Sequence, residues 1–552
     1  MLNRRWTTAW RLFRSGKVKE LLSRTFRFLS SLRDKKNKIT YPEWRQKWVD
    51  LKDEERQKIK RRIDSFYKQL SFTLILETQG YESTDIFETI KSLTVQLYPN
   101  WLLRIVNWDS MEKELKEKIL GLQDNRIKVT SHTSELGNWI IELTPGTKLH
   151  ETALFSNAFS AINRPVIEVI YSDHDHINAA GEFCDPYMKP DWNPDLFAAM
   201  NYFGPLVACK RELWETHTDD RSDKYEFLLK TTKNVSQDGI FHIPDVLASI
   251  PVSHDETHLK PTCKRITHPL PEPEPFVSIL IPTRDKGRIL EKCLESLFEK
   301  TSYSNFEVIL INHETSESKA LKVIQKFEKK SNFEKINFSG PFNFSAMMNL
   351  AGNTARGDVL VLLNNDMKII DSEWLSELVS QVSRPEVGIA GALLLFKDGT
   401  IQHAGVHPGL GGLMGHGHKH LPGDNPGYFN RLKAVHSVAA VTGACMAIEK
   451  STWFELGGLD EENLPVAYND IDLCFKARKK GLSIIFTPYA KIIHLESASR
   501  GVDDNPLIND RLQKELEIMK GRWGEILNID PAYSPNLSFD GGSFELSANP
   551  KL

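Results

Sequence analysis

The stretch VLVLLNND, residues 359–366, begins as an apolar strand and ends in three strongly polar side chains. Val and Leu in an unbroken run favour a strand that is buried on both faces. Asn364, Asn365 and Asp366 instead require water, hydrogen bonds or a cation. A buried strand that stops on such residues indicates a ligand site at its carboxyl end.

Strands and helices alternate around this stretch. Residues 276–282 and 306–312 are predicted as apolar strands, residues 288–301 and 318–330 as helices, and residues 358–366 as a third strand. This alternation predicts an α/β fold with a parallel, right-handed, doubly wound sheet. Ligands of such sheets bind beyond the carboxyl ends of the strands. We therefore expect the polar residues that follow these strands to converge on one crevice: Thr283, Arg284, Asp285, Asn312, Asn364, Asn365 and Asp366.

The composition is that of a soluble globular protein. Of 552 residues, 40% are apolar and 26% are charged, and the net charge of -3 disfavours general nucleic-acid binding. The six cysteines are scattered, which favours a reducing compartment over a disulfide framework. No apolar run reaches the roughly 18 residues of a membrane helix, and the start lacks a signal-peptide core. We expect a cytoplasmic protein without a membrane span.

The N-terminal 38 residues are strongly basic, with twelve Lys and Arg against Glu20 and Asp34. Trp6, Trp10 and Phe13 recur among them at helical spacing. An apolar face opposite a basic face predicts a helix lying on an anionic membrane surface. The alternative is a helix packed on its own domain with a solvated basic face. We predict residues 1–65 as a basic, helical, amphipathic segment, of which residues 1–38 hold the protein on the inner face of the cell membrane.

The chain contains an internal repeat. YPNWLLRIVNWDS at 98–110 and YSNFEVILINHETS at 303–316 share Tyr, Asn, an aromatic residue and Asn at one constant offset. Each is a helix end, a turn and an apolar strand that stops on Asn, which predicts two copies of one α/β unit. A Pro-rich, charged stretch between the copies is typical of a linker. We predict domains at 66–262 and 276–545, joined by a linker at 263–275.

The second copy resembles a known family. Its motifs, in this order and spacing, are similar to those of bacterial family 2 glycosyltransferases, and most similar to rhamnosyltransferase-like enzymes of O-antigen and capsule synthesis. The resemblance covers residues 273–545 and rests on these motifs: VSILIPTRDKG (277–287), GPFNFSAMMNLA (340–351), GDVLVLLNND (357–366), DGTIQHAGV (398–406), VAYNDIDLC (466–474) and HLESASRG (494–501).

The resemblance implies a GT-A nucleotide-sugar-binding fold and an inverting, metal-dependent transfer. The donor would be a nucleotide-diphosphate sugar, with rhamnose as one candidate sugar, and the acceptor a hydroxyl of a lipid-linked glycan. Mg²⁺ or Mn²⁺ would neutralise the charge that develops on the leaving diphosphate, and such hard cations prefer oxygen ligands.

The resemblance also assigns roles to residues. Asp366 would hold the metal with His494, and Asp470 would be the general base that takes the proton of the acceptor hydroxyl. Asn364 and Asn312 stand where the family usually has acids, which predicts a weaker metal site and leaves the nucleotide open. The implied donor-binding residues are Thr283, Asp285, Asn312, Asn364 and Asn365.

Structural explanations compete with these roles. Asp470 at a predicted helix start could be a cap, and a lone His494 after a strand could be structural. The Gly- and His-rich loop at 409–424 is predicted as a mobile lid over the donor. A metal cluster of His416, His418 and His420 is the alternative there.

The first copy, residues 66–262, resembles a second domain of the same family that has lost its chemistry. Thr144, Pro145 and Gly146 stand where a metal motif would end its strand, and Lys224 stands where the base would be. The acids of Asp173-His174-Asp175 lie beyond the metal position, so we predict a structural role for them. We predict a degenerate domain kept for acceptor binding or packing. The alternatives are a bifunctional enzyme with both domains active, or a non-catalytic scaffold that binds nucleotide sugar or carbohydrate.

Overall fold

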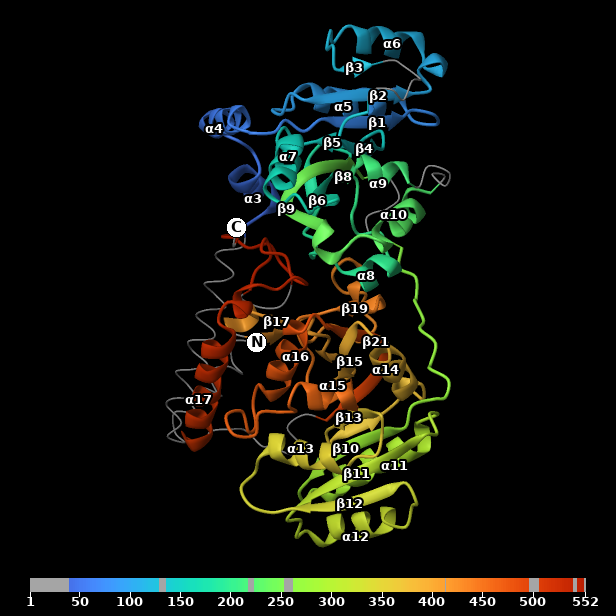
Figure 1. Cartoon of the computed structure of the whole chain (residues 1–552), viewed down its shortest axis with the longest axis vertical. Helices are drawn as coiled ribbons and strands as arrows, with labels where there is room; N and C mark the ends of the chain where they lie inside the picture. Colours follow the sequence, from blue (N-terminus) through green and yellow to red (C-terminus); the bar gives the residue numbers. More distant parts are fainter. Residues whose placement is uncertain are drawn as a thin grey trace, which may run out of the picture.

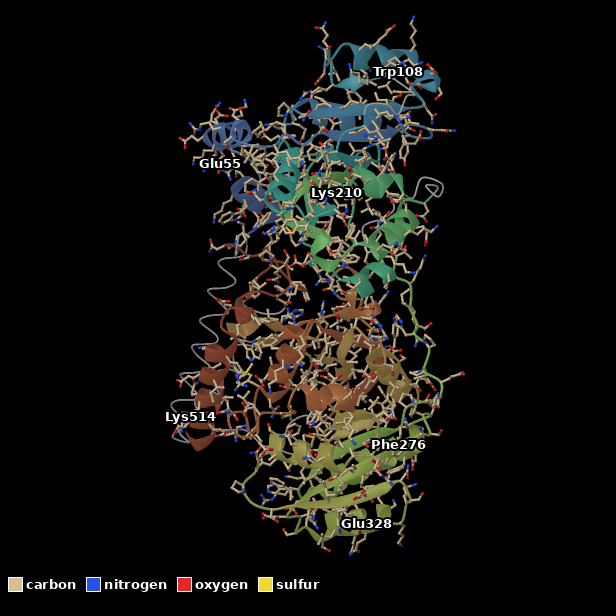
Figure 2. All side chains as sticks on the ribbon, viewed as in Figure 1. Glu55, Trp108, Lys210, Phe276, Glu328 and Lys514 are labelled. Carbon is tan, nitrogen blue, oxygen red and sulfur yellow. The ribbon has the colours of Figure 1, made fainter. Side chains whose placement is uncertain are left out.

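The computed structural model describes residues 39–550 except 129–135, 217–222, 253–261, 413, 496–505 and 540–543. The segment predicted to lie on a membrane, residues 1–38, is outside the described residues. Two α/β units follow one another along the long axis of the molecule (Figure 1). We call them the first unit, from β1 to β9, and the second unit, from β10 to α17. Figure 2 shows side chains filling the space between the elements of both.

The first unit is preceded by helices α3 (Tyr41–Trp48) and α4 (Asp53–Asp64), which lie against its side (Figure 1). Its strands are β1 (Phe72–Glu77), β2 (Trp101–Val106), β3 (Ile127–Lys128), β4 (Trp139–Leu143), β5 (Lys148–Leu149), β6 (Val169–Ile177), β7 (Phe183–Tyr187), β8 (Val207–Lys210) and β9 (Ile240–Pro251). Its helices are α5 (Ser83–Thr94), α6 (Lys113–Leu120), α7 (Ala153–Asn163), α8 (Pro194–Ala199), α9 (Arg211–Glu215) and α10 (Lys224–Lys233).

The second unit is larger and carries the predicted site. Its strands are β10 (Val277–Thr283), β11 (Phe306–His313), β12 (Phe333–Phe338), β13 (Val359–Leu363), β14 (Met367–Ile369), β15 (Val387–Leu395), β16 (Ile401–His403), β17 (Val406–Pro408), β18 (Met414–His416), β19 (His436–Ser437), β20 (Cys445–Glu449) and β21 (Ser483–His494). Its helices are α11 (Gly287–Lys300), α12 (Ser318–Phe327), α13 (Phe344–Thr354), α14 (Trp374–Val382), α15 (Lys450–Glu455), α16 (Asn469–Lys479) and α17 (Pro506–Trp523).

The two units contain sheets of the same topology. The strand order is β3-β2-β1-β4-β8-β6-β9-β5 in the first and β12-β11-β10-β13-β20-β15-β21-β14 in the second. Parallel and antiparallel pairs also follow one another in the same succession along both sheets. The repeat seen in the sequence is therefore a repeat of topology. The resemblance of the first unit to the same glycosyltransferase family stays a prediction.

The predicted parallel sheet is confirmed for β10, β11 and β13, but the parallel pairing does not continue through the rest of the sheet. Only the four strands from β12 to β13 form a continuous parallel array, because β20 runs antiparallel to both β13 and β15. An apolar run is the same in either direction, so the connections between strands decide the pairing. The sequence prediction also omitted β12 and α13. Glu334, Lys335 and Asn337 are exposed on β12, the edge strand, and such polar residues obscure the strand pattern.

Strand β13 is buried on both faces, as its composition predicts. Val359, Val361 and Leu363 pack in one apolar cluster of the second unit, whereas Leu360 and Leu362 pack in the other. Helices cover both sides of a sheet of this kind, so its strands have no polar face. Polar residues of this strand can therefore reach solvent only where the strand ends.

The two units are joined by specific polar contacts as well as by the chain between them. Asn193 and Ser437 exchange two hydrogen bonds, of 2.9 and 3.2 Å, and Arg384 forms a 2.7 Å ion pair with Asp195. The chain after α17, which we call the C-terminal segment, returns to the first unit and ends beside α3 (Figure 1). Among the described residues, no helix has the length and apolar character that a membrane crossing needs.

Candidate active site

A pocket of about 360 Å³ opens at the carboxyl ends of β10 and β13. Residues 283–285, which end and follow β10, and residues 364–366, which follow β13, form two of its sides. The pocket therefore brings together every residue of the predicted crevice except Asn312. Its full lining is Pro282, Thr283, Arg284, Asp285, Lys286, His313, Phe342, Phe344, Met347, Asn364, Asn365 and Asp366.

Asn365 holds the two strand ends together. Its amide nitrogen donates a 2.9 Å hydrogen bond to Thr283 Oγ1, and both side chains are buried. The neighbouring Asn364 is fixed through its main chain, since its N–H donates at 3.0 Å to the carbonyl of Ala444, which directly precedes β20. The polar residues after β13 are thus held in place before any ligand arrives.

Asp366 lies against His494. Strand β14 pairs antiparallel with β21, which sets Met367 opposite His494, and the N–H of Leu495 donates to the Asp366 carbonyl at 3.0 Å. The distance from His494 Nε2 to Asp366 Oδ1 is 3.1 Å, and Asp366 is only 3% exposed. The ladder between β14 and β21 therefore brings the two predicted metal ligands side by side.

The other ring nitrogen of His494 decides what this pair can hold. His494 Nδ1 lies 2.7 Å from Gln402 Oε1, and an amide oxygen only accepts, so Nδ1 carries a hydrogen. In the neutral ring, Nε2 then presents a lone pair toward a carboxylate oxygen, an arrangement that a cation stabilises. A histidine that donates its second N–H to an amide oxygen is the usual metal-ligating arrangement. The pair therefore fits a divalent cation.

A cation here would need further ligands from outside the protein. The described residues contain no group of three or more His, Cys, Asp or Glu side chains arranged to hold a metal ion. Mg²⁺ commonly takes one or two carboxylates and completes its shell with water and substrate phosphates. One carboxylate and one imidazole at the pocket suit that mode of binding.

Asp470 lies at the first turn of α16, beside the same strand ends. Its carboxylate accepts hydrogen bonds from the N–H of Gly443 at 2.8 Å and of Ile471 at 2.9 Å. Gly443 directly precedes Ala444, whose carbonyl holds Asn364, so the backbone of this turn links Asp470 to the end of β13. Asp470 is half-buried, and burial raises its pKa although these hydrogen bonds oppose the rise. It is not part of the pocket lining.

Two predicted donor-binding residues are occupied by local structure. Asp285 has a φ of 53°, and its Oδ1 accepts 2.8 Å hydrogen bonds from the N–H groups of Ser316 and Glu317, just before α12. These backbone hydrogen bonds lower its pKa. Asn312 donates to Asn337 Oδ1 at 3.0 Å and accepts from the Thr315 N–H at 3.2 Å. The structure thus brings Asp285 to the pocket and leaves Asn312 outside its lining.

The sequence prediction missed the apolar wall of the pocket. Phe342, Phe344 and Met347 come from the start of α13 and the turn before it, and His313 ends β11. His313 lies 5.9 Å from the Phe342 ring, centroid to centroid, and its Nε2 is 2.8 Å from the Gly340 carbonyl. In the sequence, the motif at 340–351 stands out only through the family resemblance, which assigns no role to its aromatic residues.

The three histidines of the loop at 409–424 have separate partners. His416 Nδ1 lies 2.8 Å from His403 Nδ1, His418 accepts from the Tyr428 N–H at 3.0 Å, and His420 stacks on Phe396. A metal cluster of these three residues is absent from the described residues. The role of this loop as a lid stays a prediction.

In the first unit, the equivalent positions carry different chemistry. Lys224 begins α10, which leads into β9 as α16 leads into β21, and its ammonium donates to the Glu142 carbonyl at 2.7 Å. Burial lowers the pKa of Lys224. Asp173 accepts from the Lys189 N–H and lies 2.8 Å from His242 Nε2, while Asp175 pairs with Arg45. Both acids are wholly buried, which fits the predicted structural role.

Residues 273–523 match the family model described as "Glycosyltransferase like family 2". The chain is 34% identical to the uncharacterized protein y4gI of Sinorhizobium fredii, over 90% of this chain and 61% of that protein. It is 28% identical to the O-antigen biosynthesis protein RfbC of Myxococcus xanthus, over 86% of this chain and 41% of that protein. The chain thus spans about 61% and 41% of the length of these relatives.

The chain also matches solved structures, at lower sequence identity than these relatives. One is GalNAc-T7 with UDP, GalNAc and Mn²⁺, at 15% identity and a TM-score of 0.37, covering 45% of this chain and 48% of that one. Another is the mannosyltransferase PcManGT of Pyrobaculum calidifontis with GDP-Man and Mn²⁺, at 15% identity and a TM-score of 0.32, covering 46% of this chain and 68% of that one.

Replacing Asp285 tests its hydrogen bonds to the start of α12. We expect Asp285→Ala to lower the free energy of unfolding by about 1 kcal/mol at neutral pH, the usual value of a helix-capping side chain. Because the folded pKa is lowered, this contribution is complete above the ordinary Asp pKa and is lost as the pH falls through the folded value. Urea unfolding at several pH values measures it. Asp64→Ala, at an exposed carboxylate, is the control, and an effect independent of pH would contradict the prediction.

Proposed function

We propose that this chain is a family 2 glycosyltransferase that transfers a sugar from a nucleotide-diphosphate donor to an acceptor hydroxyl, because residues 273–523 match the model of that family. The observation that carries this proposal is the 3.1 Å contact of His494 with Asp366, which lines a pocket at the carboxyl ends of β10 and β13. The half-buried carboxylate of Asp470, held by the turn before β20, supports the same reaction.

The pocket has the features that a nucleotide-diphosphate sugar needs. Its volume of about 360 Å³ lies within the range of small-molecule sites, roughly 300–1,000 Å³. Arg284 and Lys286 supply positive charge for the diphosphate, while Phe342 and Phe344 supply apolar surface for a base or sugar ring. The proposed donor site is completed by Thr283, Asp285, Asn364 and Asn365. Asn312 supports it indirectly: it accepts a hydrogen bond from the Thr315 N–H, and the Thr315 hydroxyl accepts one from the Asp285 N–H.

Asp366 and His494 would hold a divalent metal, Mg²⁺ or Mn²⁺, with the remaining ligands from the diphosphate and water. When bound, the metal neutralises the negative charge that develops on the leaving nucleoside diphosphate. The contribution of the chain itself is to fix both ligands through the β14–β21 ladder. Asn365 and Thr283 keep the adjoining strand ends from moving apart.

Asp470 would accept the proton of the attacking hydroxyl. A base is most effective when its pKa lies close to the working pH, and burial moves the pKa of Asp470 upward from the ordinary value. Its hydrogen bonds to the Gly443 and Ile471 N–H groups orient the carboxylate. Attack on the face opposite the leaving diphosphate inverts the anomeric carbon of the donor sugar.

A lipid-linked glycan at the inner face of the cell membrane is the proposed acceptor, since the relative RfbC is named for O-antigen biosynthesis. Rhamnose is one candidate donor sugar.

The basic segment at 1–38 would hold the protein to anionic lipid. Unchanged sedimentation with anionic vesicles after removal of these residues would contradict that attachment.

The first unit is proposed to be a degenerate copy that no longer transfers sugar. Lys224, with its ammonium held on the Glu142 carbonyl, stands at the helix start where the second unit has Asp470. The alternatives are an active first unit and a chain that only binds sugars. Sugar transfer by the Asp470→Asn protein at the rate of the unmodified chain would favour an active first unit.

Replacing Asp366 tests the metal site. We expect Asp366→Asn to weaken metal-dependent donor binding at least tenfold, because Asn removes the charge that attracts the cation. Titration calorimetry with dTDP-, UDP- and GDP-sugars, in Mg²⁺ and then in EDTA, measures this. Glu373→Gln, exposed and outside the pocket, is the matched control. Donor binding of equal strength with and without metal, unchanged in Asp366→Asn, would contradict the assignment.

Replacing Asp470 separates the base from the donor site. We expect Asp470→Asn to reduce kcat for transfer by about 10²–10⁴ while donor affinity stays the same. In the unmodified protein, activity should rise with pH as Asp470 loses its proton, with a midpoint above the ordinary Asp pKa. That rise should vanish in the variant. Glu462→Gln, exposed before the same helix, is the control, and an unaltered pH profile in Asp470→Asn would exclude Asp470 as the base.

A further inference from the structure

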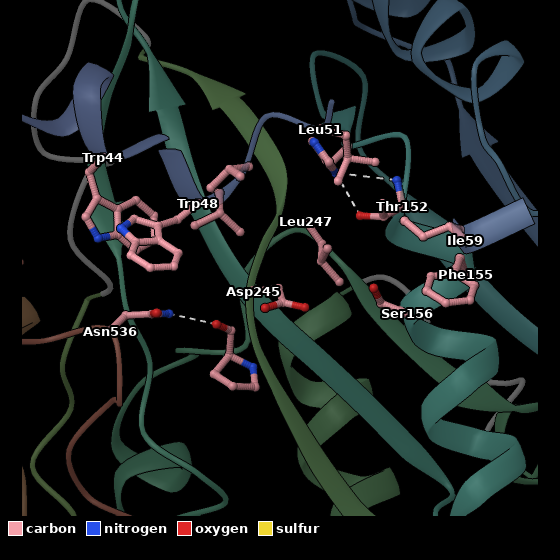
Figure 3. A pocket seen from close by; sticks show the side chains of 14 residues that line it. Trp44, Trp48, Leu51, Ile59, Thr152, Phe155, Ser156, Asp245, Leu247 and Asn536 are labelled. Atoms are coloured by element: carbon pink, nitrogen blue, oxygen red, sulfur yellow. Dashed lines mark hydrogen bonds between the residues drawn. The ribbon is translucent and has the colours of Figure 1, made fainter. Parts of the chain in front are cut away.

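A second pocket, of about 210 Å³, lies on the first unit (Figure 3). Four parts of the chain that are distant in sequence build it. Trp44 and Trp48 come from α3, Phe155 and Ser156 from α7, Asp245 and Leu247 from β9, and Asn536 from the C-terminal segment. The pocket therefore depends on the packing of α3 and of the C-terminal segment on the first unit.

Aromatic rings form one side of this pocket. Trp44 is 2% exposed, and its indole N–H donates to the Ser547 carbonyl at 2.9 Å, so the ring is held in place by the C-terminal segment. Trp48, one turn later on α3, is 38% exposed. The Lys47 ammonium lies 4.6 Å from the centroid of the Trp48 ring. The accessible indole of Trp48 is an aromatic surface of the kind on which flat ligands stack.

Unused hydrogen-bond acceptors form the other side. In Figure 3, Asp245 lies between the tryptophans and Ser156. Asp245 is exposed, and among the described residues no ion pair or hydrogen bond engages its carboxylate. Asn536 donates to the Pro244 carbonyl and to Asp173 Oδ2, and its buried Oδ1 accepts from none of the described residues. The Asp245 carboxylate is therefore an acceptor that a ligand in the pocket can reach.

The lining excludes an anionic ligand. It contains no Lys or Arg, and Asp245 is its one carboxylate, so a phosphate group would be repelled. His150 adds no charge, because burial lowers its pKa to about 4 and keeps it neutral at neutral pH. The volume is also below the roughly 300 Å³ at which pockets for drug-sized ligands begin. This pocket is therefore unsuited to a second nucleotide-sugar donor.

We propose that this pocket binds one sugar residue of the acceptor glycan. The apolar C–H face of a sugar ring would stack on Trp48, and its hydroxyl groups would donate to the exposed carboxylate of Asp245. The Ser156 hydroxyl can complete the set as donor or acceptor. This inference rests on the proposed function, and it gives the first unit a role in holding the glycan that the second unit extends.

Saturation-transfer NMR on the full chain tests the pocket directly. The probes are methyl glycosides of rhamnose, mannose, galactose, glucose and N-acetylglucosamine, each at millimolar concentration, with choline as a probe for cations. We expect signal from at least one glycoside. Trp48→Ala should abolish it, and Asp245→Asn should weaken binding roughly five- to tenfold, because a charged acceptor is replaced by a neutral one. Tyr67→Ala, an 80% exposed aromatic residue outside the pocket, should leave it unchanged.

The outcomes separate this inference from the proposed function. Glycoside signal that persists in Trp48→Ala and Asp245→Asn, or that UDP or GDP displaces, would overturn the assignment of the pocket. So would the absence of signal from every glycoside, or a signal from choline alone. Donor hydrolysis is measured in parallel and should be unchanged in both pocket variants. Its absence from the unmodified chain would count against the proposed function while leaving a pocket-dependent glycoside signal valid.

Discussion

The burial of β13 on both faces is the constraint on which the second unit depends. Its alternate side chains enter two separate apolar clusters, so no polar side chain can occupy the strand itself. Asn364, Asn365 and Asp366 are consequently displaced to its carboxyl end, where the parallel neighbour β10 also ends. The position of the pocket thus follows from the packing of the core, because a parallel sheet covered on both sides can offer polar groups to a ligand only at the ends of its strands.

The strands beyond this parallel array complete the site. Strand β21 pairs antiparallel with β14 and sets His494 against Asp366, and β20 begins after the turn whose N–H holds Asp470. Each of these side chains is oriented by a backbone ladder or a second hydrogen bond, Gln402 in the case of His494. Such support would keep the proposed metal ligands and general base in place between turnovers.

The first unit repeats the topology of the second and is bound to it by buried polar contacts. Asp195, whose pKa burial raises and Arg384 lowers, lies in the first unit and pairs with Arg384 of the second. A buried ion pair contributes modest net stability, but it is costly to break and so favours one arrangement of the two units. The C-terminal segment adds Asn536 to the first unit, on the acids of β6 and beside the second pocket. A first unit held this firmly can serve as the fixed platform for substrate that we propose.

The sequence alone determined the α/β class of the second unit, the positions of β10, β11 and β13, and the polar residues that follow them, because apolar runs and the polar residues that end them depend on nearby residues only. It also indicated the repeat. Strand β13 ends at Leu363, three residues before the end of the predicted strand. Strand direction beyond β13, the contact of His494 with Asp366, and the exclusion of Asn312 from the pocket were decided by the tertiary structure, since each depends on pairing between distant strands. The pocket of Trp48, Asp245 and Asn536 has no local signal at all, because four distant segments must first pack together to form it.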